Sequence, residues 1–197
     1  IEDYNQAISL DSNDAVFYVN RANTKNNSNA YEEAMKDYNR AIELDPNYAN
    51  AYANRGYIKD AKNDIDGALK DYSKAIDLDP NDAGSYNNRS FLLFRIGKIE
   101  DALIDANISI EKDAKNDFAY DTRGQIYMAI GRNEDALVDF NRALSLNANY
   151  IEGLDSRAKC YRKLAETEQD SAKKADLIAK AEADEKKAES LKKEEES

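Results

Sequence analysis

Tyr52-Ala-Asn54-Arg55 is one copy of a sequence motif that recurs through this chain at a constant spacing of 34 residues. The other copies are Tyr18-Val-Asn20-Arg21, Tyr86-Asn-Asn88-Arg89, Tyr120-Asp-Thr122-Arg123 and Leu154-Asp-Ser156-Arg157. A strict period of this length is typical of a solenoid in which each repeat is one helical hairpin that buries its apolar face only against its neighbours. We therefore expect an extended binding surface and no catalytic cleft.

The apolar columns of the repeat indicate two amphipathic helices. Places are counted from Ala15, Ala49, Ala83, Asp117 and Ile151. The fourth place is large and the eighth is small, as in Tyr52 and Gly56, so both lie on one helical face and a second helix can approach closely. The twentieth, twenty-fourth and twenty-seventh places form the stripe of the second helix, as in Ala68, Tyr72 and Ala75.

Turn residues separate the two helices at fixed places. The fifteenth place holds residues that adopt the left-handed conformation readily: Asn29, Asn63, Gly97 and Gly131. Pro46 and Pro80 follow the second helices, which they cannot continue. Each repeat is thus predicted to be helix, tight turn, helix.

These columns resemble the tetratricopeptide repeat family across residues 1 to 165. The resemblance implies an all-α, right-handed α-solenoid of tandem 34-residue helix-turn-helix repeats, whose first helices line a concave groove. We expect a half repeat at 1–14, full repeats at 15–48, 49–82, 83–116 and 117–150, and a divergent repeat from 151. For 166–197 a charged capping helix is expected, with a coiled-coil strand as the alternative.

Composition excludes several functions. The net charge of −11 argues against a nucleic-acid partner, which needs a basic face. The chain has no His and no Gly-rich phosphate loop, so we expect no enzyme, no metal and no cofactor. The longest apolar run, Phe91 to Phe94, is too short to insert into a membrane. Cys160 is predicted to be a buried, inert thiol; the lack of disulfides leaves the compartment open, with the cytoplasm slightly favoured.

The groove floor is expected to carry the function. Asn20, Asn54 and Asn88 share the sixth place, and a row of carboxamides matches the N–H and C=O groups of an extended peptide. The full set of predicted peptide-binding residues is Asn20, Asn23, Asn54, Tyr57, Asn88, Phe91, Thr122 and Gln125. The alternative is that the Asn side chains only bond neighbouring helices. The cations of the family's carboxylate clamp are missing, because Val19 and Gly84 stand at their places.

Three functions remain open. The first is an interaction scaffold that holds an extended segment of a protein or peptide partner. The second is an assembly module, with self-association through the N-terminal end around Tyr4 and Ile8, where part of an apolar face is expected to be uncovered. The third is a regulatory arm of a larger enzyme.

A charged pattern accompanies the repeats. Arg stands at the seventh place of every first helix, and an Asp precedes each by 18 residues: Asp3, Asp37, Asp71, Asp105 and Asp139. This predicts a ladder of ion pairs between adjacent repeats.

Overall fold

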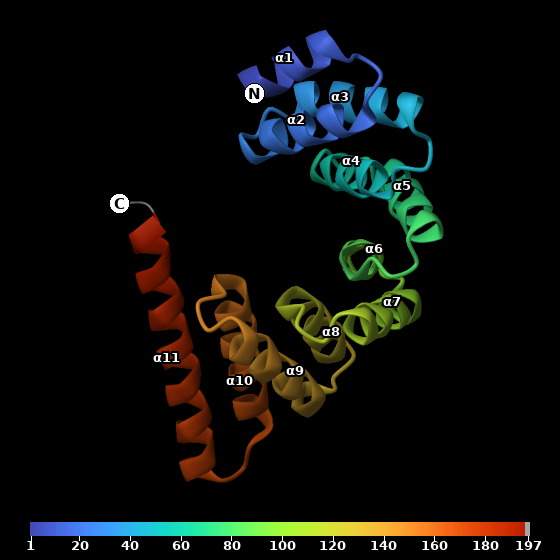
Figure 1. The fold of residues 1–197 in the computed structure, drawn as a ribbon. Helices are drawn as coiled ribbons and strands as arrows, with labels where there is room; N and C mark the ends of the chain where they lie inside the picture. The colour runs from blue at the N-terminus through green and yellow to red at the C-terminus, as the bar shows by residue number, and fades with distance from the viewer. Residues whose placement is uncertain (196–197) are drawn as a thin grey trace. The chain divides into compact units, whose positions relative to one another are not determined.

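The computed structural model describes residues 1–195, and these form eleven α-helices without strands (Figure 1). The helices are α1 (Glu2–Leu10), α2 (Ala15–Asn27), α3 (Tyr31–Leu44), α4 (Ala49–Ala61), α5 (Ile65–Leu78), α6 (Ala83–Arg95), α7 (Ile99–Lys112), α8 (Asp117–Ala129), α9 (Asn133–Leu146), α10 (Ile151–Thr167) and α11 (Ser171–Glu195). They belong to two compact units: unit 1 spans Ile1–Leu92, and unit 2 begins at Leu93. Within residues 1–195, no helix combines the length and apolar character that crossing a membrane requires.

Helix pairs are the building blocks of both units, as the repeat columns predict. In unit 1, α2 packs on α3 and α4 on α5; in unit 2, α8 packs on α9 and α10 on α11. Figure 1 shows these partners side by side. The even-numbered helices from α2 to α10 are the first helices of their repeats, and the odd-numbered helices from α3 to α11 are the second.

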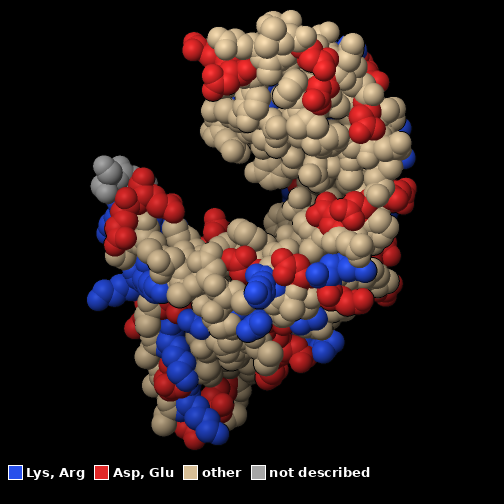
Figure 2. Space-filling model, viewed as in Figure 1, with Lys and Arg blue, Asp and Glu red and all other residues tan. Residues whose placement is uncertain are grey.

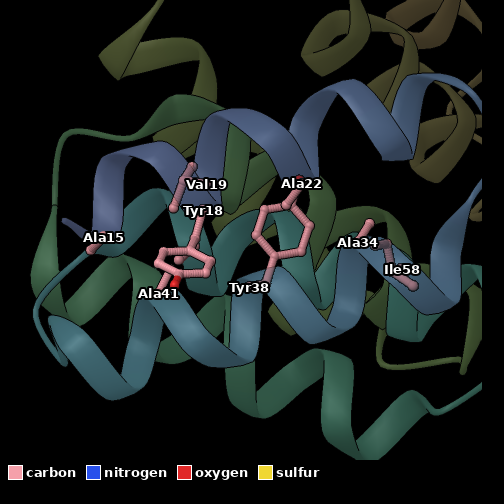
Figure 3. Close-up of a cluster of buried hydrophobic side chains, with 9 residues drawn as sticks. Ala15, Tyr18, Val19, Ala22, Ala34, Tyr38, Ala41 and Ile58 are labelled. Atoms are coloured by element: carbon pink, nitrogen blue, oxygen red, sulfur yellow. The ribbon is translucent and has the colours of Figure 1, made fainter. Parts of the chain in front are cut away.

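Large and small residues interlock at the centre of each pair. In unit 1 the Tyr38 ring lies against Ala22, within a buried cluster that includes Tyr18, Val19 and Ala41 (Figure 3). The same place in the next repeat is Gly56, where an added Cβ would lie 3.0 Å from the Tyr72 ring. Small residues at the eighth place therefore leave room for the aromatic ring of the second helix.

The turns also match the sequence. Asn29 and Asn63 have φ of 58° and 62°, and Gly97 and Gly131 have φ of 80° and 82°. The predicted left-handed conformation at the fifteenth place is confirmed. Because this conformation is strained for most L-residues, Asn or Gly at this place ends the first helix at a defined point.

The ion pairs form, but the predicted partner is wrong. In the first, second and fourth full repeats the Arg pairs with the Asp that follows it by 16 residues, as Arg55 does with Asp71 at 2.7 Å. Its Nη1 instead donates to the residue 16 positions earlier, in the preceding repeat, as from Arg55 to Asn39 Oδ1 at 2.8 Å. The same arrangement recurs at Arg21 and Arg123. The charged pair therefore joins the two helices of one repeat, and a neutral carboxamide links it to the repeat before.

The last repeat is complete, although its second helix is displaced in sequence. Helix α11 packs on α10, and Arg157 pairs with Asp184 at 2.7 Å. Asp184, Ala181 and Ala188 are buried and lie 45 residues after Asp139, Ala136 and Ala143. The capping helix is thus a second helix shifted by 11 residues, which lengthen the α10–α11 hairpin.

Candidate functional site

The first helices form one continuous face in each unit. Helix α2 touches α4 in unit 1, and α8 touches α10 in unit 2, whereas α3 and α5, or α9 and α11, make no such contact within the described part of the chain. Helices that crowd together on one side and separate on the other give each unit a concave side. We call the concave surface made by the first helices the first-helix face.

The sixth-place Asn residues differ in their contacts. Asn20 and Asn88 are half-buried, and their carboxamides make no hydrogen bond with any residue from 1 to 195. Asn54 Nδ2, by contrast, donates to Asn23 Oδ1 at 3.0 Å. Two of the three carboxamides therefore remain available to a ligand, while the third links neighbouring first helices.

Asn23 is a structural junction. Its Oδ1 also accepts a hydrogen bond of 2.6 Å from the hydroxyl of Tyr38, a ring with no exposed surface. Burial raises the pKa of Tyr38 to about 12, so the hydroxyl keeps its proton and its donor role. Asn23 thus joins α2, α3 and α4, and its amide group is the part that can still contact a ligand.

Exposed aromatic rings lie on the same helices. Tyr57 is 48% exposed, Phe91 37% and Phe118 53%. Single exposed rings are common on protein surfaces, but aromatic residues frequently anchor binding partners where they lie beside polar groups that can contact a ligand. Tyr57 and Phe91 belong to the predicted set, and Phe118 lies on the same helix as its members Thr122 and Gln125.

Thr122 and Gln125 lie around a residue that the sequence pattern did not reveal. Thr122 is buried, and Gln125 donates from Nε2 to Asp121 Oδ2 at 2.6 Å. The same Oδ2 accepts a 3.3 Å hydrogen bond from the hydroxyl of Tyr150. Asp121 is only 3% exposed, and burial raises the pKa of its carboxyl group. An acidic residue occurs at the fifth place only in the last two repeats, as Asp121 and Asp155, so the repeat pattern does not single it out.

Side-chain oxygens without a hydrogen-bond donor concentrate on the first helices. Among the described residues, Asn26 on α2, Asn87 on α6 and Asp121 on α8 each have a buried Oδ1 that receives no hydrogen bond, as does Asn133 on α9. Buried polar atoms are nearly always satisfied, by protein or by water, so such atoms require an explanation. Three of these four are on helices that form the first-helix face, where a donor from a ligand is one way to satisfy them.

Charge is unevenly distributed over the surface. Figure 2 shows Lys and Arg gathered over the C-terminal helices, interspersed with Asp and Glu. On the face shown, the surface of the first repeats is largely uncharged with acidic clusters. A basic face of the kind that nucleic acids require is not seen on this side.

Comparison with known proteins agrees with this architecture. Two family models match more than half of the chain: "TPR repeat" at residues 24–59 and 61–103, and "Tetratricopeptide repeat" at residues 117–150. The chain belongs to the tetratricopeptide repeat family. Members of this family are generally non-enzymatic scaffolds. No curated protein matches the chain in sequence.

Solved tetratricopeptide structures share the fold. YrrB, described as a TPR protein with an unusual peptide-binding site, is 22% identical with a TM-score of 0.71, and the match covers 96% of this chain and 97% of YrrB. The match to PilF of Pseudomonas aeruginosa has 19% identity, a TM-score of 0.68 and coverage of 90% and 88%. The first TPR domain of Spaghetti (RPAP3), solved with an HSP90 peptide, is 28% identical with a TM-score of 0.56, covering 59% of this chain and 93% of that domain.

Proposed function

We propose that the protein is an interaction scaffold that binds an extended segment of a partner protein along its first-helix face. The observation that carries the proposal is the polar lining of this face, where the Asn20 and Asn88 carboxamides have no hydrogen-bond partner among residues 1–195. A carboxamide offers one acceptor and two donors, which suits the backbone of an extended peptide whatever its side chains are. Exposed rings such as Tyr57 add apolar anchors beside them.

The relatives support this proposal by analogy. One neighbour in structure carries a peptide-binding site, and another was solved with a peptide bound. Each neutral hydrogen bond to a peptide contributes only about 0.5–1.5 kcal/mol, so the two carboxamides alone give a weak, sequence-tolerant grip. Aromatic and charged contacts must then supply most of the specificity.

Selection from a random-peptide library tests the proposal. The folded protein is immobilised, and enriched peptides are synthesised and titrated by fluorescence anisotropy. We expect enriched peptides to bind, and the Asn20→Ala/Asn88→Ala variant to bind them several-fold more weakly while unfolding at an unchanged temperature. The control is Asn39→Ala/Asn141→Ala: these exposed carboxamides are on second helices and accept hydrogen bonds from Arg55 and Arg157, so this variant should lose some stability but no affinity for the peptides.

Two results would contradict the proposal. One is the absence of any enriched peptide. The other is a set of peptides that change the amide chemical shifts of the second helices and not those of α2 and α6, which carry Asn20 and Asn88. Assembly through the solenoid ends and a role as the regulatory arm of an enzyme stay predictions. The first is tested by measuring the molecular mass in solution over a range of protein concentrations.

A further inference from the structure

Asp121 differs from the other buried aspartates that the structure describes in full. Asp37, Asp71, Asp139 and Asp184 each receive an Arg side chain at 2.8 Å or less. No Lys or Arg from the described chain lies within ion-pair distance of Asp121, although it is 3% exposed; its Oδ1 receives no hydrogen bond, and the groups that lower its pKa, Gln125, Ser156 and Tyr150, are all neutral. A buried carboxylate of this kind is normally paired with a cation.

The surroundings of Asp121 are partly aromatic. Phe118 and Gln125 are on α8, three residues before Asp121 and four after it, so all three share one side of the helix. Tyr150, which precedes α10, donates its hydroxyl to Asp121, and its ring meets the Phe118 ring edge-on at 5.1 Å. We call these four residues the Asp121 cluster. It combines one carboxylate with an aromatic ring that is half open to solvent.

The Tyr150 ring packs against Gly153, three residues later on α10. Gly153 is buried, and a Cβ placed on it would lie 2.5 Å from Cδ1 of Tyr150. The corresponding place in the other repeats holds Phe17, Ala51, Ser85 and Ala119, all with a Cβ. The Tyr150 ring therefore packs into the space that Gly153 leaves without a side chain, a combination found in this repeat alone.

The local charge is negative. Asp117 and Glu152 add to the Asp121 carboxylate, and burial, followed by these charges, raises the pKa of Tyr150. The described residues contain no group of three or more potential ligands placed to hold a metal ion. An organic cation therefore fits better than a metal.

We propose that the Asp121 cluster receives a Lys or Arg side chain of the partner segment. The proposal rests on the proposed function and gives it a chemical preference. Gln125 is half-buried and is bound to Asp121 by its amide alone, so it can rotate away and leave Oδ2 to the incoming ammonium or guanidinium group. The exposed Phe118 ring then packs against the cation, as aromatic faces do.

A two-way comparison tests this inference. The random-peptide library is selected separately on the unmodified protein and on Asp121→Asn. On the unmodified protein we expect enriched peptides to share a Lys or Arg at one position, and on Asp121→Asn we expect that preference to disappear. A consensus peptide and its counterpart with Gln in place of the cation are then titrated against both proteins.

The four affinities form a double-mutant cycle. We expect the Gln peptide to bind the unmodified protein about 10- to 30-fold more weakly than the consensus peptide, because it leaves a buried charge unpaired. Against Asp121→Asn the two peptides should bind within about twofold of each other. Asp155→Asn is the matched control, since Asp155 occupies the same place one repeat later but is already paired with Lys192 at 2.9 Å, and it should keep the preference.

The outcomes separate the two proposals. If no peptide is enriched on any variant, the peptide-binding function itself fails. If peptides are enriched without a common cation, or if Asp121→Asn retains the preference, the scaffold stands and the cation site is wrong. Phe118→Leu supplies a second variant: it keeps the carboxylate and should reduce the discrimination between the two peptides.

Discussion

Replacing Asp71 with Asn tests the network that fixes each hairpin. The Asp71 side chain is 3% exposed and accepts from Arg55 Nε and Nη2 at 2.7 and 2.8 Å and from Lys59 Nζ at 2.7 Å. Arg55 and Lys59 are only 17% and 19% exposed, so both lose their counter-charge in a poorly solvated position. Breaking a buried pair costs about 3–5 kcal/mol, and the remaining exposure of the cations places Asp71→Asn near the lower end, at about 3 kcal/mol.

Two companion variants separate the contacts within a repeat from those between repeats. Arg55→Met leaves Asp71 with Lys59, so we expect a loss of about 2 kcal/mol. Asn39→Ala removes only the neutral acceptor for Arg55 Nη1, on the exposed side of α3, and should cost about 0.5–1 kcal/mol. Urea unfolding followed by circular dichroism measures all three, because urea leaves the ionic strength unchanged.

The order of the three stability losses shows whether the strong ion pair lies within one repeat or between two repeats. The double variant Arg55→Met/Asp71→Asn should lose clearly less than the sum of the two single losses, which shows that the residues are coupled. Equal losses for Asn39→Ala and Asp71→Asn, or additive behaviour of Arg55 and Asp71, would refute the assignment of the strong pair to a single repeat.

Three further predictions follow from the packing and the ionisation of buried groups. Gly124→Ala should lower the thermal midpoint and cost about 1–3 kcal/mol, since its Cβ would lie 2.7 Å from the Phe140 ring; an unchanged midpoint would show that the ring moves freely. Burial raises the pKa of the Cys160 thiol to about 11, so iodoacetamide should modify it at neutral pH only after unfolding, as mass spectrometry will show. Burial also raises the pKa of Asp121, so the folded protein holds this proton more tightly than the unfolded chain. Stability therefore falls as pH rises above the ordinary Asp value, and Asp121→Asn should be the more stable protein near pH 7 but not near pH 3.

The periodic part of the structure is predictable because each place of the repeat occurs several times in the chain, and the residue types found there agree. Gly56 or Tyr72 alone would indicate little, but the alternation of large and small at the same places in successive repeats specifies which faces meet. The left-handed turns are predictable for the same reason, since Asn29, Asn63 and Gly97 share one place. Family models that rest on these columns match the same region.

Periodicity cannot choose between partners that are equally periodic. Asp37 lies 16 residues after Arg21 and 18 before Arg55, and both separations recur through the chain. The choice depends on how the two antiparallel helices of one hairpin align, and there Asp37 meets Arg21 and Lys25. Burial opposes ionisation of Asp37, but the hydrogen bonds from these cations outweigh it and lower its pKa.

The sequence predicts the capping helix itself but not its place as the second helix of the last repeat, because an inserted segment shifts every later place. A search at a spacing of 45 residues would have found it, since Ala181, Asp184 and Ala188 repeat the buried positions of α9 at that distance. The size of the side chains does not reveal this helix either, because Glu185 occupies the place where the other repeats carry mainly aromatic residues. In the structure Glu185 is paired with Arg162 of α10 at 2.7 Å, so an exposed ion pair replaces a buried ring.

Asp121 shows why the binding site is harder to predict than the fold. A residue that serves stacking recurs, because every interface needs it, whereas a residue that serves a ligand is needed once. At the fifth place Val19 and Ala53 are apolar and Asp155 has Lys192, so only Asp121 combines burial with a negative charge that nothing in the described chain neutralises. Such local inconsistencies are where functional sites are expected, because the free protein gives up stability that binding restores. If Asp121→Asn stabilises the protein and abolishes the preference for a cation, the same carboxylate accounts for both effects.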